Sequence, residues 1–154
     1  TKFGGHPMAA GLSLPTENID LFRAKLNRQQ TLTEKELTPV TWIDVPMPVS
    51  YASKKLVEQL RVLEPFGKGN EKPVFADRKL TVRSANMIGK NKNVLKMQLE
   101  DTQGHVVDAI QFKVEEEDMP LRGKEISIVY YPDINEFRGN QTLQFIVQEW
   151  CYTT

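Results

Sequence analysis

A short segment near the start of the chain combines one histidine with small residues, in the order Gly4-Gly5-His6-Pro7-Met8-Ala9-Ala10-Gly11. Small side chains let a backbone approach a ligand closely, and exposed N–H groups on a glycine loop form a concavity that binds anions. His6 can donate a hydrogen bond to phosphate. The alternative is a tight turn that leads into a buried strand and carries an incidental histidine. The candidate phosphate-contacting residues are Gly4, Gly5, His6, Ala9, Ala10 and Gly11.

A second candidate surface is the basic stretch from Arg78 to Lys96, which borders a single acid, Asp77. Its segment Lys90-Asn91-Lys92-Asn93 is expected at the tip of a β-hairpin, where cations would follow a sugar-phosphate backbone. The alternative is that this tip is rich in lysine and asparagine only because it is solvated. The candidate cations of the stretch are Arg83, Lys90, Lys92 and Lys96.

Aromatic side chains supply stacking platforms for the bases of single strands. The candidates for this role are Tyr130, Tyr131 and Phe137, and the nearby Arg138 and the earlier Lys68 are further candidate nucleic-acid contacts. We expect Trp42 and Trp150 to pack in two separate cores. The acidic run Glu115-Glu116-Glu117-Asp118 would repel DNA, so we expect it to be solvated and to face away from a bound strand.

The first part of the chain reads as a mixture of extended and helical segments. Residues 1–14 are expected to form a glycine-rich loop that feeds a short strand, and Thr16 suits the N-cap of a helix that ends near Gln30. Residues 40–49 alternate as an extended segment whose prolines place it at a sheet edge. Ser53 is expected to cap a second helix, which Pro65 stops. The apolar face of that second helix is predicted to comprise Leu56, Leu60 and Leu63.

From Val74 onward the chain reads as five short alternating strands. Asp101-Thr102-Gln103-Gly104 is typical of a hairpin turn, and residues 114–121 form a connector or a single helical turn. A connector between the third and fourth strands suits an OB-fold barrel, although other small barrels and sandwiches stay open on pattern alone. The predicted inward residues are Leu80 and Val82, then Leu95, Met97 and Leu99, then Val106, Ile110 and Phe112, then Ile126, Ile128 and Tyr130, and finally Leu143, Phe145 and Val147.

The composition is that of a globular protein, and it leaves the binding partner open. Twenty basic and twenty acidic residues give a formal net charge of zero, so nucleic-acid binding would have to rest on a local cluster of cations. Cys151 is the only cysteine, which excludes an intrachain disulfide and favours a reducing, cytoplasmic setting. No apolar run approaches the roughly 20 residues that span a bilayer, so we expect no membrane association.

Two motifs resemble known families. Gly-Gly-His-x-x-Ala-Ala-Gly, followed by Leu12-Ser13-Leu14-Pro15 and an amphipathic helix, is similar to the closing motif of the DHHA1 domain in DHH-superfamily phosphoesterases. Leu63-Glu64-Pro65-Phe66-Gly67-Lys68-Gly69-Asn70, followed by Pro73-Val74-Phe75, resembles the hallmark that precedes the OB domain in the RecJ single-strand-specific exonucleases. The resemblance covers essentially the whole chain.

The resemblance implies a mixed α+β chain: residues 1–38 would be the C-terminal part of a DHHA1 domain, residues 39–64 a strand-helix connector, and residues 65–154 a five-stranded antiparallel OB-fold barrel. It also implies a bacterial, cytoplasmic parent enzyme that degrades single-stranded DNA from 5′ to 3′ in repair and recombination with Mn²⁺ or Mg²⁺. The Asp-His-His motif is absent, and His6 and His105 are the only histidines. We therefore expect this fragment to have no catalytic residues, no metal site and no nuclease activity of its own.

Two other interpretations stay open. In one, the barrel is a non-catalytic module that docks a repair partner such as a helicase or a single-strand-binding protein. In the other, the parent is a DHH-family phosphodiesterase that acts on oligoribonucleotides or cyclic dinucleotides. The motif at residues 65–70 and the appended barrel argue against the latter, because members with small substrates generally lack this barrel.

Overall fold

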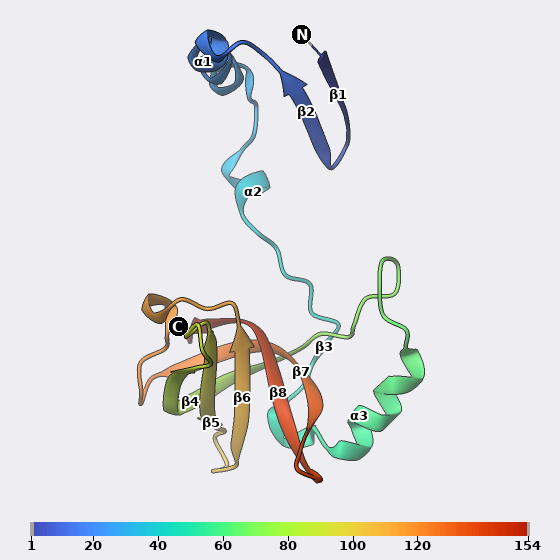
Figure 1. Cartoon of the computed structure of the whole chain (residues 1–154). Helices are drawn as coiled ribbons and strands as arrows, with labels where there is room; N and C mark the ends of the chain where they lie inside the picture. The colour runs from blue at the N-terminus through green and yellow to red at the C-terminus, as the bar shows by residue number, and fades with distance from the viewer. Residues whose placement is uncertain (1, 154) are drawn as a thin grey trace. The chain divides into compact units, whose positions relative to one another are not determined.

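The structure, a computed structural model, describes residues 2–153 of the chain (Figure 1). The chain divides into two compact units, the first ending at Thr41 and the second beginning at Trp42. The first unit contains a β-hairpin and two helices, and the second contains the remaining helices and a large sheet. No helix within residues 2–153 is long and apolar enough to cross a membrane.

The first unit opens with a β-hairpin, where the sequence predicted a glycine loop that feeds one strand. Strand β1 (Lys2–His6) pairs antiparallel with β2 (Ala9–Ser13), and residues 7 and 8 form the turn. Gly5 lies opposite Ala10, and a Cβ added to Gly5 would lie 2.8 Å from the Cα of Ala10. The two strands approach so closely here that only glycine fits at this position.

Two helices follow the hairpin. A 3₁₀ turn, η1 (Thr16–Asn18), precedes α1 (Ile19–Gln29), so the prediction that Thr16 caps the helix is wrong, whereas the predicted end near Gln30 is confirmed. The short helix α2 (Glu34–Leu37) begins with a capping box. In this box the Thr33 side chain accepts from the Glu36 amide, and the Glu36 carboxylate accepts from the Thr33 amide at 2.8 Å.

The described part of the first unit, residues 2–41, contains no buried residue. The hairpin and α1 instead line an open hollow of about 400 Å³ with apolar side chains. About 40 residues rarely build a sufficient core alone, and this unit leaves even its largest apolar side chains in contact with solvent. The apolar residues of the hollow are Phe3, Leu12, Leu14, Leu21 and Phe22.

The second unit begins with a short edge strand and a helix. Strand β3 (Val45–Pro46) pairs parallel with the next strand and lies at the end of the sheet order, as its prolines predicted. After η2 (Val49–Tyr51), the helix α3 (Lys54–Leu60) is capped by Ser53, whose Oγ accepts from the Leu56 amide at 3.1 Å, which confirms that prediction. The helix then tightens into η3 (Arg61–Leu63).

The packed face of α3 differs from the predicted stripe. Val57 is the buried residue of the helix, Leu56 and Leu60 are half-buried, and Leu63 is exposed. Leu63 lies in η3, where three residues make a turn, so the 3.6-residue spacing that placed it on the stripe no longer applies.

Five long strands of the second unit form most of its sheet, which Figure 1 shows. The β4–β5 and β7–β8 connections are tight hairpins, and a 3₁₀ turn lies in the connector between β6 and β7, as predicted for residues 114–121. The bounds are β4 (Phe75–Ile88), β5 (Val94–Glu100), β6 (Val106–Phe112), η4 (Glu116–Asp118), β7 (Glu125–Phe137) and β8 (Asn140–Tyr152).

The topology corrects the expectation of five antiparallel strands. The order is β3-β4-β5-β6-β8-β7, and β4 also pairs with β7, so the sheet closes on itself. The added edge strand β3 makes six strands, and the β3–β4 and β6–β8 pairings are parallel. The β6–β8 pair is parallel because the connector after β6 leads to β7, which is not adjacent to β6. The β7–β8 hairpin then places β8 next to β6 in the same direction. The closed arrangement of the five long strands is that of an OB-fold.

Alternation of side chains predicts the core correctly on four of the long strands and wrongly on β6. On β6, Ala109 is buried, whereas Val106 and Phe112 are exposed. The pairing of Met97 with Ala109 sets this phase, and a shift of one residue moves every side chain of a strand to the other face. The buried residues confirmed on the other strands are Leu80, Val82, Leu95, Met97, Leu99, Ile126, Ile128, Tyr130, Phe145 and Val147.

The two tryptophans differ in their surroundings. Trp150 packs against the barrel core and makes an edge-to-face contact with Tyr152 at a centroid distance of 5.2 Å, as predicted. The prediction for Trp42 is wrong, because this side chain is 85% exposed. It lies in the segment before β3, where only a two-residue strand pairs with the sheet.

Candidate nucleic-acid interface

The hairpin of the first unit holds all the small residues of the first candidate site. Gly4 lies opposite Gly11, Gly5 opposite Ala10, and His6 opposite Ala9, so the two glycine-rich segments face each other across one ladder. The imidazole of His6 is exposed, and its Nδ1 accepts a hydrogen bond from the Met8 amide at 3.3 Å. Its Nε2 therefore carries the proton when the ring is neutral and can donate outward, which is the geometry that a phosphate contact needs.

The lysine-rich tip lies where the sequence placed it, between β4 and β5. Gly89 and Lys92 have positive φ angles of 85° and 46°, and the Lys92 amide donates to the Gly89 carbonyl at 3.2 Å. Lys90 and Lys92 are exposed. We call residues 89–93 the lysine tip.

An acidic segment lies at the same end of the barrel as the lysine tip. The amide of Val114 donates to the carbonyl of Asn93 at 3.1 Å, and η4 follows two residues later with Glu116, Glu117 and Asp118. These carboxylates reduce the positive potential around the tip. The expectation that the acidic run faces away from a bound strand stays a prediction.

The other two cations of the basic stretch differ in their availability. Arg83 forms an ion pair with Glu100, and the hydrogen bond to that carboxylate, followed by its charge, raises the pKa of the guanidinium. Part of its charge is therefore already compensated. Lys96 points outward from β5, opposite Asn86 on one side and Ile110 on the other, and is exposed.

Tyr130 cannot stack on a base, which corrects the prediction made for it. Its side chain is fully buried, with its ring 6.0 Å from Phe75 and 5.2 Å from Phe145, measured between centroids. Burial, and then the charge of Asp77, raise the pKa of its hydroxyl. Tyr130 alternates inward with Ile126 and Ile128, a pattern that the sequence already showed.

Phe137 and Arg138 lie at the turn between β7 and β8. Phe137 is 64% exposed, and the guanidinium carbon of Arg138 lies 5.1 Å from the centroid of its ring. Arg138 and Gly139 both have positive φ, as a two-residue hairpin turn with the twist of its strands requires. The two strands stay paired up to this turn, where Phe137 lies opposite Asn140.

The β7–β8 turn and the lysine tip lie at opposite ends of the barrel. The first residue of β5, Val94, pairs with the last residue of β6, Phe112, so the lysine tip adjoins the end of β6. Strand β8 runs parallel to β6 and begins immediately after the β7–β8 turn, at the lower edge of the sheet in Figure 1. A single strand of DNA that contacts both the lysine tip and the β7–β8 turn must therefore cross the outer surface of the sheet.

The segment of residues 65–70 is a rigid turn that presents Lys68. The backbone groups of Gly67 and Asn70 exchange two hydrogen bonds, of 2.8 and 3.0 Å, and Gly69 has φ 84°. The Asn70 amide group also donates to the carbonyls of Leu63 and Pro65, at 2.8 and 2.9 Å. The chain is thus held on both sides of Lys68, whose side chain is exposed at the tip.

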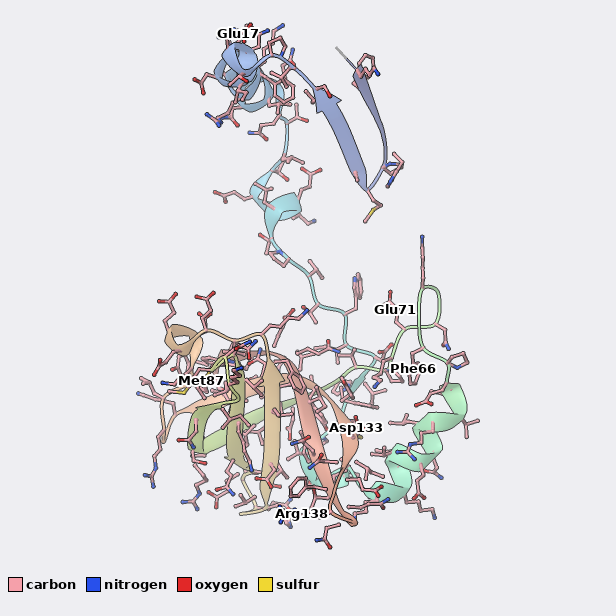
Figure 2. All side chains as sticks on the ribbon, viewed as in Figure 1. Glu17, Phe66, Glu71, Met87, Asp133 and Arg138 are labelled. Atoms are coloured by element: carbon pink, nitrogen blue, oxygen red, sulfur yellow. The ribbon has the colours of Figure 1, made fainter. Side chains whose placement is uncertain are left out.

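An aromatic contact anchors this turn to the barrel. The ammonium of Lys72 lies 4.0 Å from the centroid of the Tyr131 ring on β7 and 5.6 Å from that of Phe66, whose side chain Figure 2 labels beside the turn. Both distances suit cation–π attraction. Tyr131 is half-buried beneath this cation, so it serves the anchor, and stacking on that face would displace Lys72.

The candidate residues fall into separate groups, and the predicted stacking residues did not include Phe112. His6 and its neighbours belong to the first unit, whereas the lysine tip, the Lys68 turn and the β7–β8 turn belong to the second. Phe112 is 55% exposed on the outer face of β6, next to the lysine tip, although the sequence predicted it to be inside. Apolar residues occupy both faces of β6, and the one sequence signal for the solvent-facing side is Asp108, which shares the face of Phe112.

Comparisons with known proteins agree with this architecture. The family model described as the RecJ OB domain matches residues 43–149. The chain is 38% identical over 150 residues to the single-stranded-DNA-specific exonuclease RecJ of Haemophilus influenzae, covering 95% of this chain and 26% of that protein. It is 32% identical to the RecJ of Bacillus subtilis, covering 96% of this chain and 19% of that protein. The chain thus spans about a quarter or less of these relatives.

The fold also matches a solved structure. The crystal structure of RecJ from Thermus thermophilus in complex with Mn²⁺ superposes with a TM-score of 0.70 at 18% sequence identity, covering 99% of this chain and 22% of that one. A structure of the same protein in complex with Mg²⁺ gives a TM-score of 0.67. At this identity the likeness concerns the fold.

Proposed function

Because the chain belongs to the RecJ OB-domain family, we propose that it is the strand-binding C-terminal portion of a longer RecJ-like exonuclease. That enzyme would degrade single-stranded DNA from 5′ to 3′ during repair and recombination in the bacterial cytoplasm. The observation that carries the proposal is the closed barrel with an exposed lysine tip, in a chain matched over 95% of its length by a single-stranded-DNA-specific exonuclease. The barrel would grip the strand while residues outside this chain cleave it.

We propose that residues 1–38 are the end of a DHHA1 domain, of which the rest lies outside this chain. The support is physical: residues 2–41 bury nothing, yet the hairpin and α1 line an apolar hollow. Such a hollow is stable when further apolar residues cover it. In the longer protein the hairpin with Gly4, Gly5 and His6 would then face the DNA phosphates, with the imidazole of His6 donating outward from Nε2.

Residues 39–64 would connect this domain to the barrel. From Trp42 onward they belong to the same compact unit as the barrel. Two contacts hold the connector: the Val49 amide donates to the Asp77 carboxylate at 2.7 Å, and the Tyr130 hydroxyl donates to the Met47 carbonyl at 2.8 Å. These contacts fix the connector on the barrel.

A divalent metal does not fit the residues that the structure describes. Within residues 2–153, no three His, Cys, Asp or Glu side chains lie close enough together to hold a metal ion. Two-metal hydrolysis needs several such ligands around water and phosphate. The Mn²⁺ or Mg²⁺ of the parent enzyme would then be held by residues outside this chain.

The experiment that tests the proposal measures both binding and cleavage by this 154-residue chain. Binding to fluorescent single-stranded DNA, followed by anisotropy at several salt concentrations, is expected to be weak and to weaken further as salt rises. Duplex DNA of the same sequence is the control and should bind less well. Incubation of the same preparation with Mn²⁺ or Mg²⁺ should leave the labelled strand intact. A chain that bound no single-stranded DNA at low salt would disprove the proposal.

Docking of a repair protein, such as a helicase or a single-strand-binding protein, is the second candidate function. It is favoured by the large apolar side chain of Trp42, which is strongly exposed. Exposed apolar side chains are frequent contact points between proteins. Binding of such a protein by a chain that ignored oligonucleotides would support this candidate over the first.

A further inference from the structure

An apolar row crosses the outer surface of the barrel beside the lysine tip. Phe112 on β6 lies opposite Val94 on β5, and Val94 lies opposite Ile88 on β4. Side chains alternate along a strand. Leu95, next to Val94, and Ala109, three residues before Phe112, are buried in the core, so the three side chains of the row point outward. Phe112 and Ile88 are exposed and Val94 is half-buried. We call Ile88, Val94 and Phe112 the outer row.

Cations lie on both sides of the outer row. The lysine tip directly joins Ile88 to Val94, which places Lys90 and Lys92 beyond one side. On the other side, the next outward positions are Lys96 and its cross-strand neighbours Asn86 and Ile110. The sheet surface therefore offers an exposed aromatic ring with ammonium groups before and after it.

The positive part of this surface is short. One step further along β5 and β6, Gln98 lies opposite Asp108, and the Gln98 amide nitrogen lies 3.5 Å from the Asp108 carboxylate. Beyond it, Glu100 is engaged with Arg83. The acidic turn η4 limits the surface at the end of β6. Phosphates would therefore be attracted only near the outer row.

We propose that a base of the bound single strand stacks on the Phe112 ring, while Lys96 and the lysine tip hold the phosphates on either side of it. This inference rests on the proposed function and names the surface that carries it. An exposed ring between cations suits an unpaired base, because every base offers a π-face for stacking. A duplex has no free base faces along its length, so Phe112 would also select single strands.

The test compares Phe112→Ala with Val106→Ala in the 154-residue chain. Val106 is the matched control, because it is 52% exposed on the outer face of the same strand, at the end distant from the lysine tip. Phe112→Ala is expected to weaken binding of a short oligo-dT by about fivefold to 150-fold, the loss of one stacked base, with little change in salt dependence. Phe112→Tyr keeps the ring and should keep most of the affinity.

An oligonucleotide of the same length made of abasic sites separates stacking from other effects. Phe112→Ala and the unchanged chain should bind this probe equally, because it has no base to stack. Stacking on Phe112 is overturned if the Phe112→Ala chain binds oligo-dT as tightly as the Val106→Ala chain does. It is also overturned if Phe112→Ala weakens binding of the abasic probe as much as binding of oligo-dT. In both cases the proposed function stands. If the unchanged chain binds no single strand, the proposed function itself fails, and this inference fails with it. Circular dichroism confirms that each variant is folded.

Discussion

The Tyr130 hydroxyl donates a 2.8 Å hydrogen bond to the carbonyl oxygen of Met47, and this bond joins barrel strand β7 to the segment after β3. The ring itself packs in the core between Phe75 and Phe145. The residue that the sequence offered as a base-stacking platform therefore holds the connector on the barrel.

Tyr130→Phe should lower the free energy of unfolding by about 1–3 kcal/mol, because the Met47 carbonyl loses its hydroxyl partner while the ring stays packed. Urea denaturation measures this loss. Affinity for single-stranded DNA should not change at temperatures where the variant is folded. The control is Tyr131→Phe. It removes the hydroxyl of the next residue, which points to the other face of β7, and keeps its ring beneath Lys72. A folded, fully stable Tyr130→Phe chain with reduced DNA affinity would contradict the buried role.

Neutralising the lysine tip should change the salt dependence of DNA binding. Lys92 has a positive φ, so Lys92→Asn combined with Lys90→Ala removes both charges with little backbone strain. If both lysines contact phosphate, the slope of log affinity against log salt should flatten by about 1.4, twice the value of about 0.7 per contact on a single strand. Titrations at several salt concentrations measure the slope.

The matched control for the lysine tip is Lys55→Ala, because Lys55 is an exposed cation on α3, away from the tip in the chain. It should leave the slope as it is. An unchanged slope in the double variant would mean that the tip is only a solvated turn.

Asn70→Ala should weaken DNA binding through Lys68. The variant loses the two side-chain hydrogen bonds to the carbonyls of Leu63 and Pro65, so the turn no longer holds Lys68 in one place. We expect Asn70→Ala and Lys68→Ala to cost similar affinity, and the double variant to cost little more than either, since residues that act together are not additive. Gln59→Ala, on the exposed face of α3, is the control. Fully additive losses would show that Asn70 and Lys68 act independently.

The turn between β5 and β6 should make stability depend on pH in the acid range. Burial raises the pKa of Asp101, but hydrogen bonds from the amide and imidazole of His105 and from the amide of Gln103 outweigh it, so the net pKa is lowered. A lowered pKa in the folded state contributes stability that is present above the unfolded value of about 3.9 and is lost as pH falls through the folded value.

Asp101→Asn tests this dependence, because it removes the charge and keeps one acceptor oxygen for the turn. The unchanged chain should be more stable than the variant at neutral pH, and the difference should shrink toward zero in strong acid. Thermal unfolding across the acid range measures the difference. Asp108→Asn, an exposed acid on the adjacent strand, is the control. A difference that grew on acidification would contradict the assignment.

The sequence alone predicts most of the fold because most elements have their apolar residues on one face and polar residues on the other. Leu95, Met97 and Leu99 alternate with polar residues, so their burial follows from the period of a strand. Ser53 and Gly104 mark a helix start and a hairpin turn through local chemistry, and the structure shows both. These features depend on residues that are neighbours in sequence.

Strand β6 shows where the sequence reaches its limit. Val106, Ile110 and Phe112 share one face with Asp108, and Val107 and Ala109 share the other with Gln111, so each face is mostly apolar with one polar residue. Pairing of Met97 with Ala109 decides which face turns inward. That choice buries the small alanine and leaves the phenylalanine exposed, which creates the outer row.

By itself, then, the sequence determined most of the strands and helices, where the lysine tip and the rigid turn occur, and which family the motifs resemble. The tertiary structure decided which of these groups share a surface. It placed the lysine tip beside Phe112 and at the opposite end from Arg138, and it buried Tyr130. Such choices depend on pairings between distant segments, such as that of Tyr130 with Met47, 83 residues apart, which no local pattern encodes.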